Sequence, residues 1–347
     1  MSTQMEKEIK EQPEAIARTL EASRGPVEAL CRDIRARDVT YVTIAARGTS
    51  DNAGVYAKYI LPAFNGLPVA LTTPSLFTFY KKPPRLRNVL VLGISQSGQS
   101  EDIVEVLRTA RAQGALTAAI TTDPDSPLAA TAQHTLPLAT GLEKAVAATK
   151  TFTSSLALLA QLSVTLDEEK ERRRSLEALP KLMGQACEMA EKAVTPRAER
   201  YRFMDRCVVI ARGYSYAIAF EIALKLKELT YVTALPYSSA DFLHGPIAIV
   251  EPGFPVMVIV PKGELYPHLK EFTEQVAARS AELLVVSNSE EVLRLGEARF
   301  PIPDGVPEWL APVLSVVPGQ FLALNLSLAK GIDPDKPRGL KKVTVTR

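Results

Sequence analysis

The residues with the clearest chemical potential form the segment Ser95-Gln96-Ser97-Gly98-Gln99-Ser100. An apolar run, Val89–Ile94, precedes it and is typical of a buried parallel strand. Residues 101–113 follow with apolar positions at helical spacing. A loop that joins a strand to a helix N-terminus gathers free backbone N–H groups and the positive end of the helix dipole. Serine hydroxyls on such a loop predict a phosphate site, which we call the cradle (residues 95–100).

Two observations limit this interpretation. The segment has neither a Walker lysine nor a G-x-G-x-x-G pattern, which argues against a nucleotide. Glu101 and Asp102 follow directly and count slightly against an anion nearby, although acidic residues also suit a first helical turn. An ordinary strand-to-helix turn capped by Ser97 or Ser100 is the alternative, and these residues alone leave both interpretations open.

Composition restricts the class of protein. The 347 residues are 46% hydrophobic, which suits a soluble globular chain of about two domains. A net charge of +2 gives no sign of a nucleic-acid partner. No apolar run is expected to reach the ~18 residues of a membrane span, and the polar start has no signal-peptide core. We expect a cytoplasmic protein that binds neither nucleic acid nor membrane.

The three cysteines and three histidines are scattered without the spacing of metal ligands. They predict reduced thiols, no metal site and no cofactor. These residues are Cys31, Cys187, Cys207, His134, His244 and His268.

The chain repeats itself at an offset of 212 − 47 = 165 residues, measured from Arg47 to Arg212. Three apolar segments match near this offset, which predicts two copies of one α/β unit around parallel sheets. Ligands of such doubly wound sheets bind beyond the carboxyl ends of the strands, where Arg47–Ser50 and the cradle fall. The second copy has Pro261-Lys262-Gly263-Glu264 in place of the cradle, so we expect one phosphate site per chain. The matched segments are 40–46 with 207–211, 89–94 with 255–260, and 117–121 with 283–287.

The expected organisation has five parts. A mixed-charge run, Asp167–Arg174, is interpreted as solvated helix rather than as a cluster of ligand-binding arginines. Prolines are frequent after Phe300, so the last helix is expected from about Gly319 to Lys330. The parts are an N-terminal segment (1–25), a first domain with the cradle (26–165), a connecting helix (166–195), a second domain (196–330) and a C-terminal tail (331–347).

A second group of polar residues lies on a largely apolar helix from about Tyr216 to Leu229. Glu221, Lys225 and Glu228 are spaced i, i+4, i+7 and share one stripe, whereas Lys227 points elsewhere. A solvent-facing edge is the plain alternative, with a Glu221–Lys225 pair worth a few tenths of a kcal/mol. For a helix this apolar, we favour a stripe that lines a pocket.

His244 lies in the loop His244-Gly245-Pro246. A single histidine is usually structural or simply exposed. Loops of this kind nevertheless often carry function, and an imidazole can transfer protons near neutral pH.

Together, these motifs resemble the sugar isomerase (SIS) family. Within it they are similar to the isomerase half of glutamine:fructose-6-phosphate amidotransferases and to glucosamine-6-phosphate deaminases of that type. The resemblance spans nearly the whole chain, and its strength comes from the order of motifs that are individually weak. In chain order they are residues 5–13, Arg47-Gly48-Thr49-Ser50, the cradle, Val146–Thr153, Ala223–Glu228, His244-Gly245-Pro246, Lys330–Asp333 and Pro337–Val345.

The resemblance implies two tandem SIS domains, each a flavodoxin-like, doubly wound parallel sheet flanked by helices. It also implies that the substrate is a hexose 6-phosphate. The phosphate would be held by four cradle residues, and the sugar hydroxyls by residues near two further segments. The implied binding residues are Ser95, Gln96, Ser97 and Ser100 for the phosphate, and Thr49, Ser50 and the backbone near Val146 for the sugar.

The resemblance also implies catalytic roles. Glu228 would move the proton between C1 and C2, and one carboxylate can do so in an aldose–ketose shift. Lys225 would assist this transfer. His244 would open the sugar ring from the partner subunit, which requires a homodimer. Lys342 would form a Schiff base with the ketose carbonyl, although a lysine in a terminal tail is ordinarily just solvated.

Two residues depart from the family pattern. Arg47 stands where the family usually has cysteine, and Ala148 stands where the synthases have a serine that touches substrate. The amidotransferases also carry a glutaminase with an N-terminal cysteine, whereas the first cysteine here is Cys31. We therefore expect no glutaminase activity and a glucosamine-6-phosphate deaminase reaction.

Three alternatives remain open. The first is a related enzyme, such as a fructosamine 6-phosphate deglycase or a galactosamine-6-phosphate deaminase. The second is a sugar-phosphate sensor, which would not need Glu228, His244 and Lys342 together. The third, a nucleotide binder, lacks its glycine fingerprint.

Overall fold

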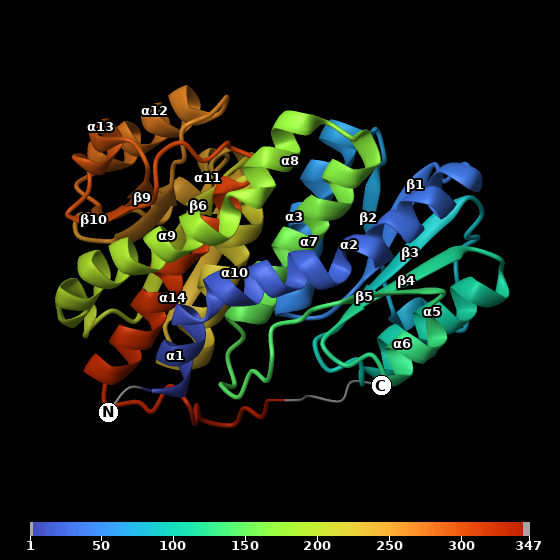
Figure 1. Ribbon diagram of the computed structural model, residues 1–347. Coiled ribbons are helices and arrows are strands. Elements are labelled where there is room, and N and C mark those ends of the chain that lie inside the picture. The colour runs from blue at the N-terminus through green and yellow to red at the C-terminus, as the bar shows by residue number, and fades with distance from the viewer. Residues whose placement is uncertain (1–2, 343–347) are drawn as a thin grey trace. The chain divides into compact units, whose positions relative to one another are not determined.

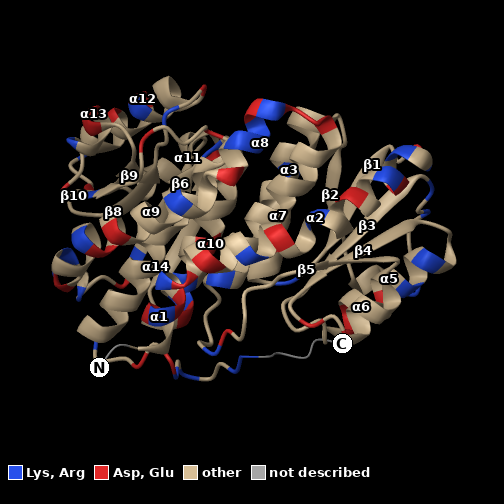
Figure 2. Ribbon diagram, in the orientation of Figure 1, with Lys and Arg blue, Asp and Glu red and all other residues tan. Residues whose placement is uncertain are grey.

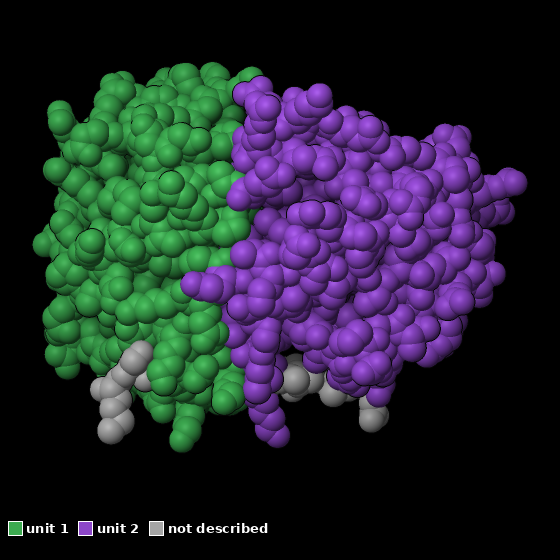
Figure 3. Space-filling model, in the orientation of Figure 1, with its two compact units in different colours: residues 1–13, 144–149, 178–340 green, residues 14–143, 150–177, 341–347 purple. Residues whose placement is uncertain are grey.

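The chain folds into two compact units, which Figure 3 colours separately. Unit 1 comprises Met1–Pro13, Lys144–Thr149 and Ala178–Leu340, and unit 2 comprises Glu14–Glu143, Lys150–Glu177 and Lys341–Arg347. The computed structural model describes residues 3–342, so the end of the predicted tail, 343–347, lies outside the described residues.

Unit 2 is built on a sheet of five parallel strands in the order β2-β1-β3-β4-β5, flanked by helices (Figure 1). This order is that of flavodoxin-like sheets, in which the strand order reverses between β1 and β3. The strands are β1 (Tyr41–Ala45), β2 (Val69–Leu71), β3 (Val89–Ile94), β4 (Leu116–Thr121) and β5 (His134–Pro137). The helices are α2 (Gln12–Ala36), α3 (Thr49–Asn65), α4 (Ser75–Thr78), α5 (Glu101–Ala112), α6 (Pro127–Thr131), α7 (Lys150–Asp167) and α8 (Lys170–Glu177).

Strand β3 positions the cradle because it is buried along its whole length. Its alternate residues Val89 and Val91 belong to the same core cluster as Ile103 and Leu107 of α5. A Cβ atom on Gly93 would lie 2.8 Å from Leu107 Cδ1, so glycine lets α5 pack closely on the strand. Each buried Val, Ile or Leu side chain contributes about 1.5–3 kcal/mol, which fixes the loop between β3 and α5.

Unit 1 repeats this design. Its parallel strands lie in the order β10-β9-β8-β6-β7, which is the unit 2 order read from the other edge. The predicted repeat is confirmed, since β6, β8 and β9 correspond to β1, β3 and β4. The strands are β6 (Arg206–Ala211), β7 (Thr233–Ser238), β8 (Pro255–Ile259), β9 (Glu282–Ser287) and β10 (Ala298–Pro301). The helices are α1 (Gln4–Lys10), α9 (Leu179–Val194), η1 (Thr195–Tyr201), η2 (Gly213–Ser215), α10 (Tyr216–Thr230), α11 (Ser239–Leu243), η3 (Pro246–Ile249), α12 (Tyr266–Ala277), α13 (Glu290–Leu293) and α14 (Ala311–Ala329).

Helix α14 begins earlier than the sequence suggested, so the expected start near Gly319 was wrong. Pro312 sits in its first turn, where no backbone N–H is needed, and Pro318 is accommodated inside the helix. A Cβ on Gly319 would lie 2.4 Å from Ile222 Cγ1, so this glycine lets α14 pack closely on α10. The helix carries no charged residue (Figure 2).

Contrary to the expectation from sequence, α14 is long and apolar enough to cross a membrane by length and composition. In the structure, 89% of its apolar window is buried inside the protein. Its burial is that of a core helix of a globular unit, packed against α9 and α10.

The segment expected as one connecting helix (166–195) contains two. The mixed-charge run forms α8, and Pro180 starts the separate helix α9. Arg172 in this run is buried, pairs with Asp167 and lies 3.6 Å from the centre of the Phe64 ring, which is a structural role. The N-terminal segment (1–25) is α1 and the first half of α2, which runs on to Ala36.

All three cysteines lie in the described part of the chain, are buried and form no disulfide there. Burial raises the pKa of Cys31 and of Cys207 to about 12. Since only the thiolate reacts, about one thiol in 10⁴ would be reactive at pH 8. We expect a thiol-specific colorimetric reagent to titrate none of them in the native protein at pH 8 and all three in denaturant. Stoichiometric labelling of the native protein within minutes would contradict this burial.

Candidate active site

The cradle leaves its hydroxyls available instead of using them as a helix cap. Ser100 occupies the N-cap position of α5, yet its side chain makes no capping hydrogen bond. The Ser95 and Ser100 hydroxyl oxygens lie 3.5 Å apart, and Ser97 Oγ accepts from the Gln99 backbone N–H at 3.3 Å. The Ser100 side chain therefore does not cap α5, whereas the Ser97 hydroxyl accepts from the backbone of its own loop. An anion site at the N-terminus of α5 stays a prediction.

Gly98 is required in the cradle for two reasons. Its φ is +63°, a conformation that residues with a side chain rarely adopt, and a Cβ there would lie 2.1 Å from Ser126 Oγ. The loop is held from β4 as well, because the Gln96 carbonyl accepts from Thr121 Oγ1 at 3.0 Å and from the Thr122 backbone N–H at 3.0 Å. The cradle is thus pre-formed by its own unit.

Arg47 neutralises the acidic residue that counted against an anion. It follows β1, and its Nε and Nη2 atoms each lie 2.8 Å from Asp102 Oδ2. Asp102 is fully buried, and its Oδ1 accepts from the Ile103 backbone N–H at 3.0 Å. Burial raises the pKa of Asp51, in the first turn of α3, and Arg47 opposes that rise. The guanidinium, 51% exposed, thus ties the end of β1 to the start of α5.

Replacing Arg47 with methionine should destabilise the fold, because the buried Asp102 carboxylate would lose both guanidinium donors. Leaving such a charged group short of partners costs about 2 kcal/mol. Because α5 carries the cradle, the KM for a sugar phosphate should also rise. Urea unfolding and steady-state kinetics measure the two effects. An unchanged unfolding midpoint in Arg47→Met would show that the pair does not hold α5.

Thr49 and Ser50 form the first residues of α3, directly after Gly48, whose φ is +54°. Both are partly buried. They follow β1 as the cradle follows β3, so both segments lie at the carboxyl edge of the same sheet. Their role in binding a sugar stays a prediction.

Glu143 is a candidate site residue that the sequence analysis did not identify. Its carboxylate is buried and accepts at least four hydrogen bonds from described residues. The donors are Gln96 Nε2 (3.2 Å), Thr151 N–H (3.2 Å), Thr151 Oγ1 (2.7 Å) and Lys342 Nζ (2.8 Å). One buried carboxylate therefore connects a cradle side chain to the lysine of the tail. A glutamate in a loop gives no local signal of this role.

Lys342 does not behave as a solvated tail residue. Its side chain is 23% exposed, and its ammonium group lies on the Glu143 carboxylate. An amine held against a buried carboxylate can pass its proton to that group and attack a carbonyl. Gln96 and Lys342, which are 246 residues apart in the chain (342 − 96), therefore meet at one group within unit 2.

The polar stripe of α10 is largely buried in unit 1, and its predicted role as a pocket lining stays a prediction. Lys225 Nζ lies 3.4 Å from Glu221 Oε1 and 2.6 Å from Glu228 Oε2. Glu221 and Lys225 are buried, whereas the Glu228 side chain is 25% exposed. The alternative of a solvent-facing edge is wrong for the first two. Lys227 is exposed, as predicted. Glu228 is the partly exposed member of this stripe.

The remaining predicted site residues lie in unit 1 as well. Val146 is partly buried in the segment Lys144–Thr149, which we call the site loop. His244 follows α11 and is exposed. The next residue, Gly245, has φ +137°, which turns the chain sharply into η3. Within its unit, the structure therefore joins Lys225 to Glu228 and leaves His244 on an exposed loop.

Comparison with known proteins agrees with this geometry. The model of the SIS domain matches residues 37–165 and 203–330, one copy in each half of the chain. Glutamine–fructose-6-phosphate aminotransferase (isomerizing) of Aquifex aeolicus is 36% identical over 99% of this chain. The aminotransferase of the same name from Gloeobacter violaceus is 36% identical over 98% of it. The chain spans 57% and 58% of the length of these two relatives.

Solved structures show the same fold. The structure described as a candidate phosphosugar isomerase of Silicibacter pomeroyi has a TM-score of 0.85 and 35% identity, covering 96% of this chain and 100% of that one. The C-terminal domain of glucosamine-fructose-6-phosphate aminotransferase from Francisella tularensis has a TM-score of 0.85 and 27% identity, covering 97% and 99%. The chain therefore belongs to the SIS domain family, and its two α/β units carry the phosphosugar isomerase fold.

Proposed function

We propose that this protein is a glucosamine-6-phosphate deaminase, which converts glucosamine 6-phosphate and water into fructose 6-phosphate and ammonia. The phosphate would bind in the cradle, on the side chains of Ser95, Gln96, Ser97 and Ser100. Thr49, Ser50 and the backbone at Val146 would bind the sugar. Neither a metal nor an organic cofactor takes part in the proposed reaction.

The observation that carries the proposal is the buried Glu143 carboxylate, which accepts from both Gln96 and Lys342. A sugar anchored by its phosphate presents its carbonyl end at a fixed distance from the cradle. An amine tied to the same cradle through one carboxylate suits Schiff-base chemistry on that carbonyl. A phosphate-binding sensor would have no use for this amine.

The proposed reaction balances without an oxidant or reductant. His244 opens the ring, and Glu228, paired with Lys225, moves a proton from C2 to C1. The C2 amine gives a second proton to the C1 oxygen, which leaves an imine at C2 and a hydroxyl at C1. The Lys342 amine adds to that imine and releases ammonia, and water then hydrolyses the new Schiff base to the ketose. Glu143 takes up and returns the proton of the lysine.

The names of the relatives support the choice of sugar in the proposed reaction. They are named as aminotransferases of fructose 6-phosphate, and this chain spans 57–59% of the length of the first three. The proposed reaction interconverts the same amino sugar and ketose and needs only water as its co-reactant. A cytoplasmic location belongs to the proposal, in keeping with three buried cysteines that form no disulfide in the described part of the chain.

The test is release of ammonia and fructose 6-phosphate from glucosamine 6-phosphate by the purified chain. We expect saturable turnover with equal amounts of the two products. The same assay with galactosamine 6-phosphate and fructosamine 6-phosphate asks whether Arg47 and Ala148 select another sugar. Faster turnover of either would replace the proposed substrate. Tight binding of the sugar phosphates without any turnover would overturn the enzyme proposal in favour of a sensor.

We also propose a homodimer in which His244 serves the site of the partner subunit. The exposure of this residue on its loop is compatible with such a role. Mixing inactive Glu228→Gln and His244→Ala variants should then restore up to about a quarter of the wild-type activity, because one of the two sites in a mixed dimer is intact. Sedimentation of the active enzyme as a monomer would refute the shared site.

A further inference from the structure

We propose that helix α1 is a positioning element of the site, which fixes the site loop through Glu8 and the tail through Asp335. This inference rests on the proposed function and adds two positioning residues to it. In this proposal neither residue contacts the reacting atoms.

Glu8 holds the start of the site loop. Its side chain is fully buried, and its two oxygens accept from the backbone N–H groups of Lys144 (2.5 Å) and Ala145 (3.1 Å). Gln4 Nε2 adds a third hydrogen bond at 2.8 Å. Charged acceptors on backbone N–H groups make strong, directional bonds. Because Glu143 is joined to Lys144 by one peptide bond, fixing Lys144 restricts where Glu143 can lie.

Asp335 holds the tail to the other end of the same helix. Its carboxylate accepts from the backbone N–H groups of Gln4 (2.7 Å) and Met5 (3.0 Å), two of the donors that a helix N-terminus leaves unpaired. Three residues further on, the Arg338 backbone N–H donates to Tyr231 Oη at 2.7 Å, and its guanidinium lies 4.5 Å from the centre of that ring. Tyr231 follows α10 directly.

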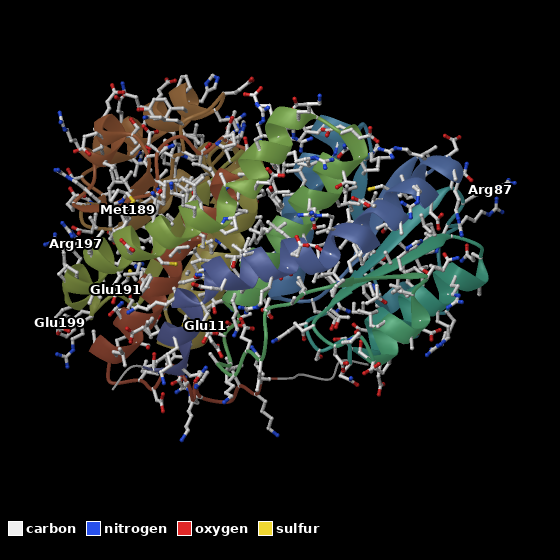
Figure 4. All side chains as sticks on the ribbon, viewed as in Figure 1. Glu11, Arg87, Met189, Glu191, Arg197 and Glu199 are labelled. Atoms are coloured by element: carbon white, nitrogen blue, oxygen red, sulfur yellow. The ribbon has the colours of Figure 1, made fainter. Side chains whose placement is uncertain are left out.

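These anchors limit the freedom of the reactive lysine. Lys342 is four residues beyond Arg338, so its Cα can lie at most about 14 Å from the Arg338 Cα. The helix itself is well seated, since Met5 and Ile9 are fully buried and α1 packs on α14 and α9. Lys10 adds ion pairs with Glu6 and with Glu191, which is labelled in Figure 4.

Helix α1, which is seven residues long, therefore holds two chain segments. One begins next to Glu143 and the other leads to Lys342, and these two residues form an ion pair. Loss of the Glu8 or the Asp335 contacts would free one partner of that pair to move relative to the other. Displacing catalytic groups by about 1 Å can lower a rate by about 10²-fold. We therefore expect Glu8 and Asp335 to act on kcat rather than on phosphate binding.

The experiment compares Glu8→Gln and Asp335→Asn with Glu6→Gln, a matched control on the same helix. We expect about a tenfold or larger fall in kcat for the first two, a KM within about threefold of wild type, and a control within about twofold. Reductive trapping of fructose 6-phosphate on Lys342 should slow in parallel. The double variant should lose less than the product of the single losses, because both changes act through α1.

Two further readouts keep the inference falsifiable. If Glu8 and Asp335 served stability alone, the variants would melt at lower temperature with unchanged kcat and trapping per folded molecule, which would overturn the inference. Tryptic cleavage after Arg338, followed by mass spectrometry, needs no activity and should accelerate in Asp335→Asn but not in Glu6→Gln. A wild-type chain that releases no ammonia would refute the proposed function, and equal cleavage rates would refute the role of α1.

Discussion

Changing Glu143 to glutamine should lower kcat/KM for ammonia release by about 10²–10³-fold, since a positioned proton-transfer group contributes on this scale. The carboxylate accepts from Lys342, Gln96 and Thr151. Glutamine keeps the shape, but its amide would set N–H groups against donors and would leave the Lys342 ammonium without its counter-charge. The amine would then be displaced from the site, and nothing beside it would take its proton. Steady-state ammonia release measures the effect.

The matched control is Glu101→Gln in the first turn of α5, which removes an exposed negative charge beside the cradle. We expect kcat/KM within about threefold of wild type for this control, as for other surface changes. Thr151→Val, which removes a single hydroxyl donor to Glu143, should give an intermediate loss. Activity of Glu143→Gln within tenfold of wild type would show that this carboxylate does not govern the lysine.

Changing Glu228 to glutamine should have the largest effect, a fall in kcat of about 10³–10⁴-fold with little change in KM, because it removes the group that moves the proton. Its side chain is the accessible member of the α10 stripe, and Lys225 Nζ lies 2.6 Å from its Oε2. Lys225 would still pair with the buried Glu221, so we expect the fold to persist. Thermal unfolding of the variant checks that the loss is chemical.

Isotope exchange distinguishes a proton-transfer role from a binding role. In deuterium oxide, the wild type should introduce deuterium at C1 of fructose 6-phosphate, and Glu228→Gln should not. Lys227→Gln, one residue earlier on the exposed face, is the control and should exchange normally. Exchange at the wild-type rate in Glu228→Gln would assign the proton transfer to another group.

The fold could be read from the sequence because its signals are local and repeated. Apolar runs such as Val89–Ile94 give the buried strands, and the 165-residue offset gives the second sheet. The start of α14 could not be predicted, because a proline usually argues against a helix. A proline is compatible with a helix in the first turn, or where neighbouring packing accommodates it. Pro312 and Pro318 are such cases.

The candidate site also has a part that could be predicted from the sequence and a part that could not. The cradle follows from residue types on a strand-to-helix loop, and the α10 stripe follows from helical spacing. Glu143 and Glu8 could not be found, because the contact that marks each glutamate, with Lys342 and with Lys144 respectively, joins residues more than a hundred positions apart. The pairing of Asp102 was missed for a similar reason, because its partner Arg47 follows β1, a different strand from the one that precedes Asp102.

Reduction with borohydride in the presence of fructose 6-phosphate, followed by peptide mass mapping, tests the central claim most directly. The account predicts one stable hexitol phosphate adduct per chain, on Lys342, and a much slower adduct in Glu143→Gln. Absence of any adduct under conditions of active turnover, or an adduct on Lys225 or Lys150 instead, would contradict it.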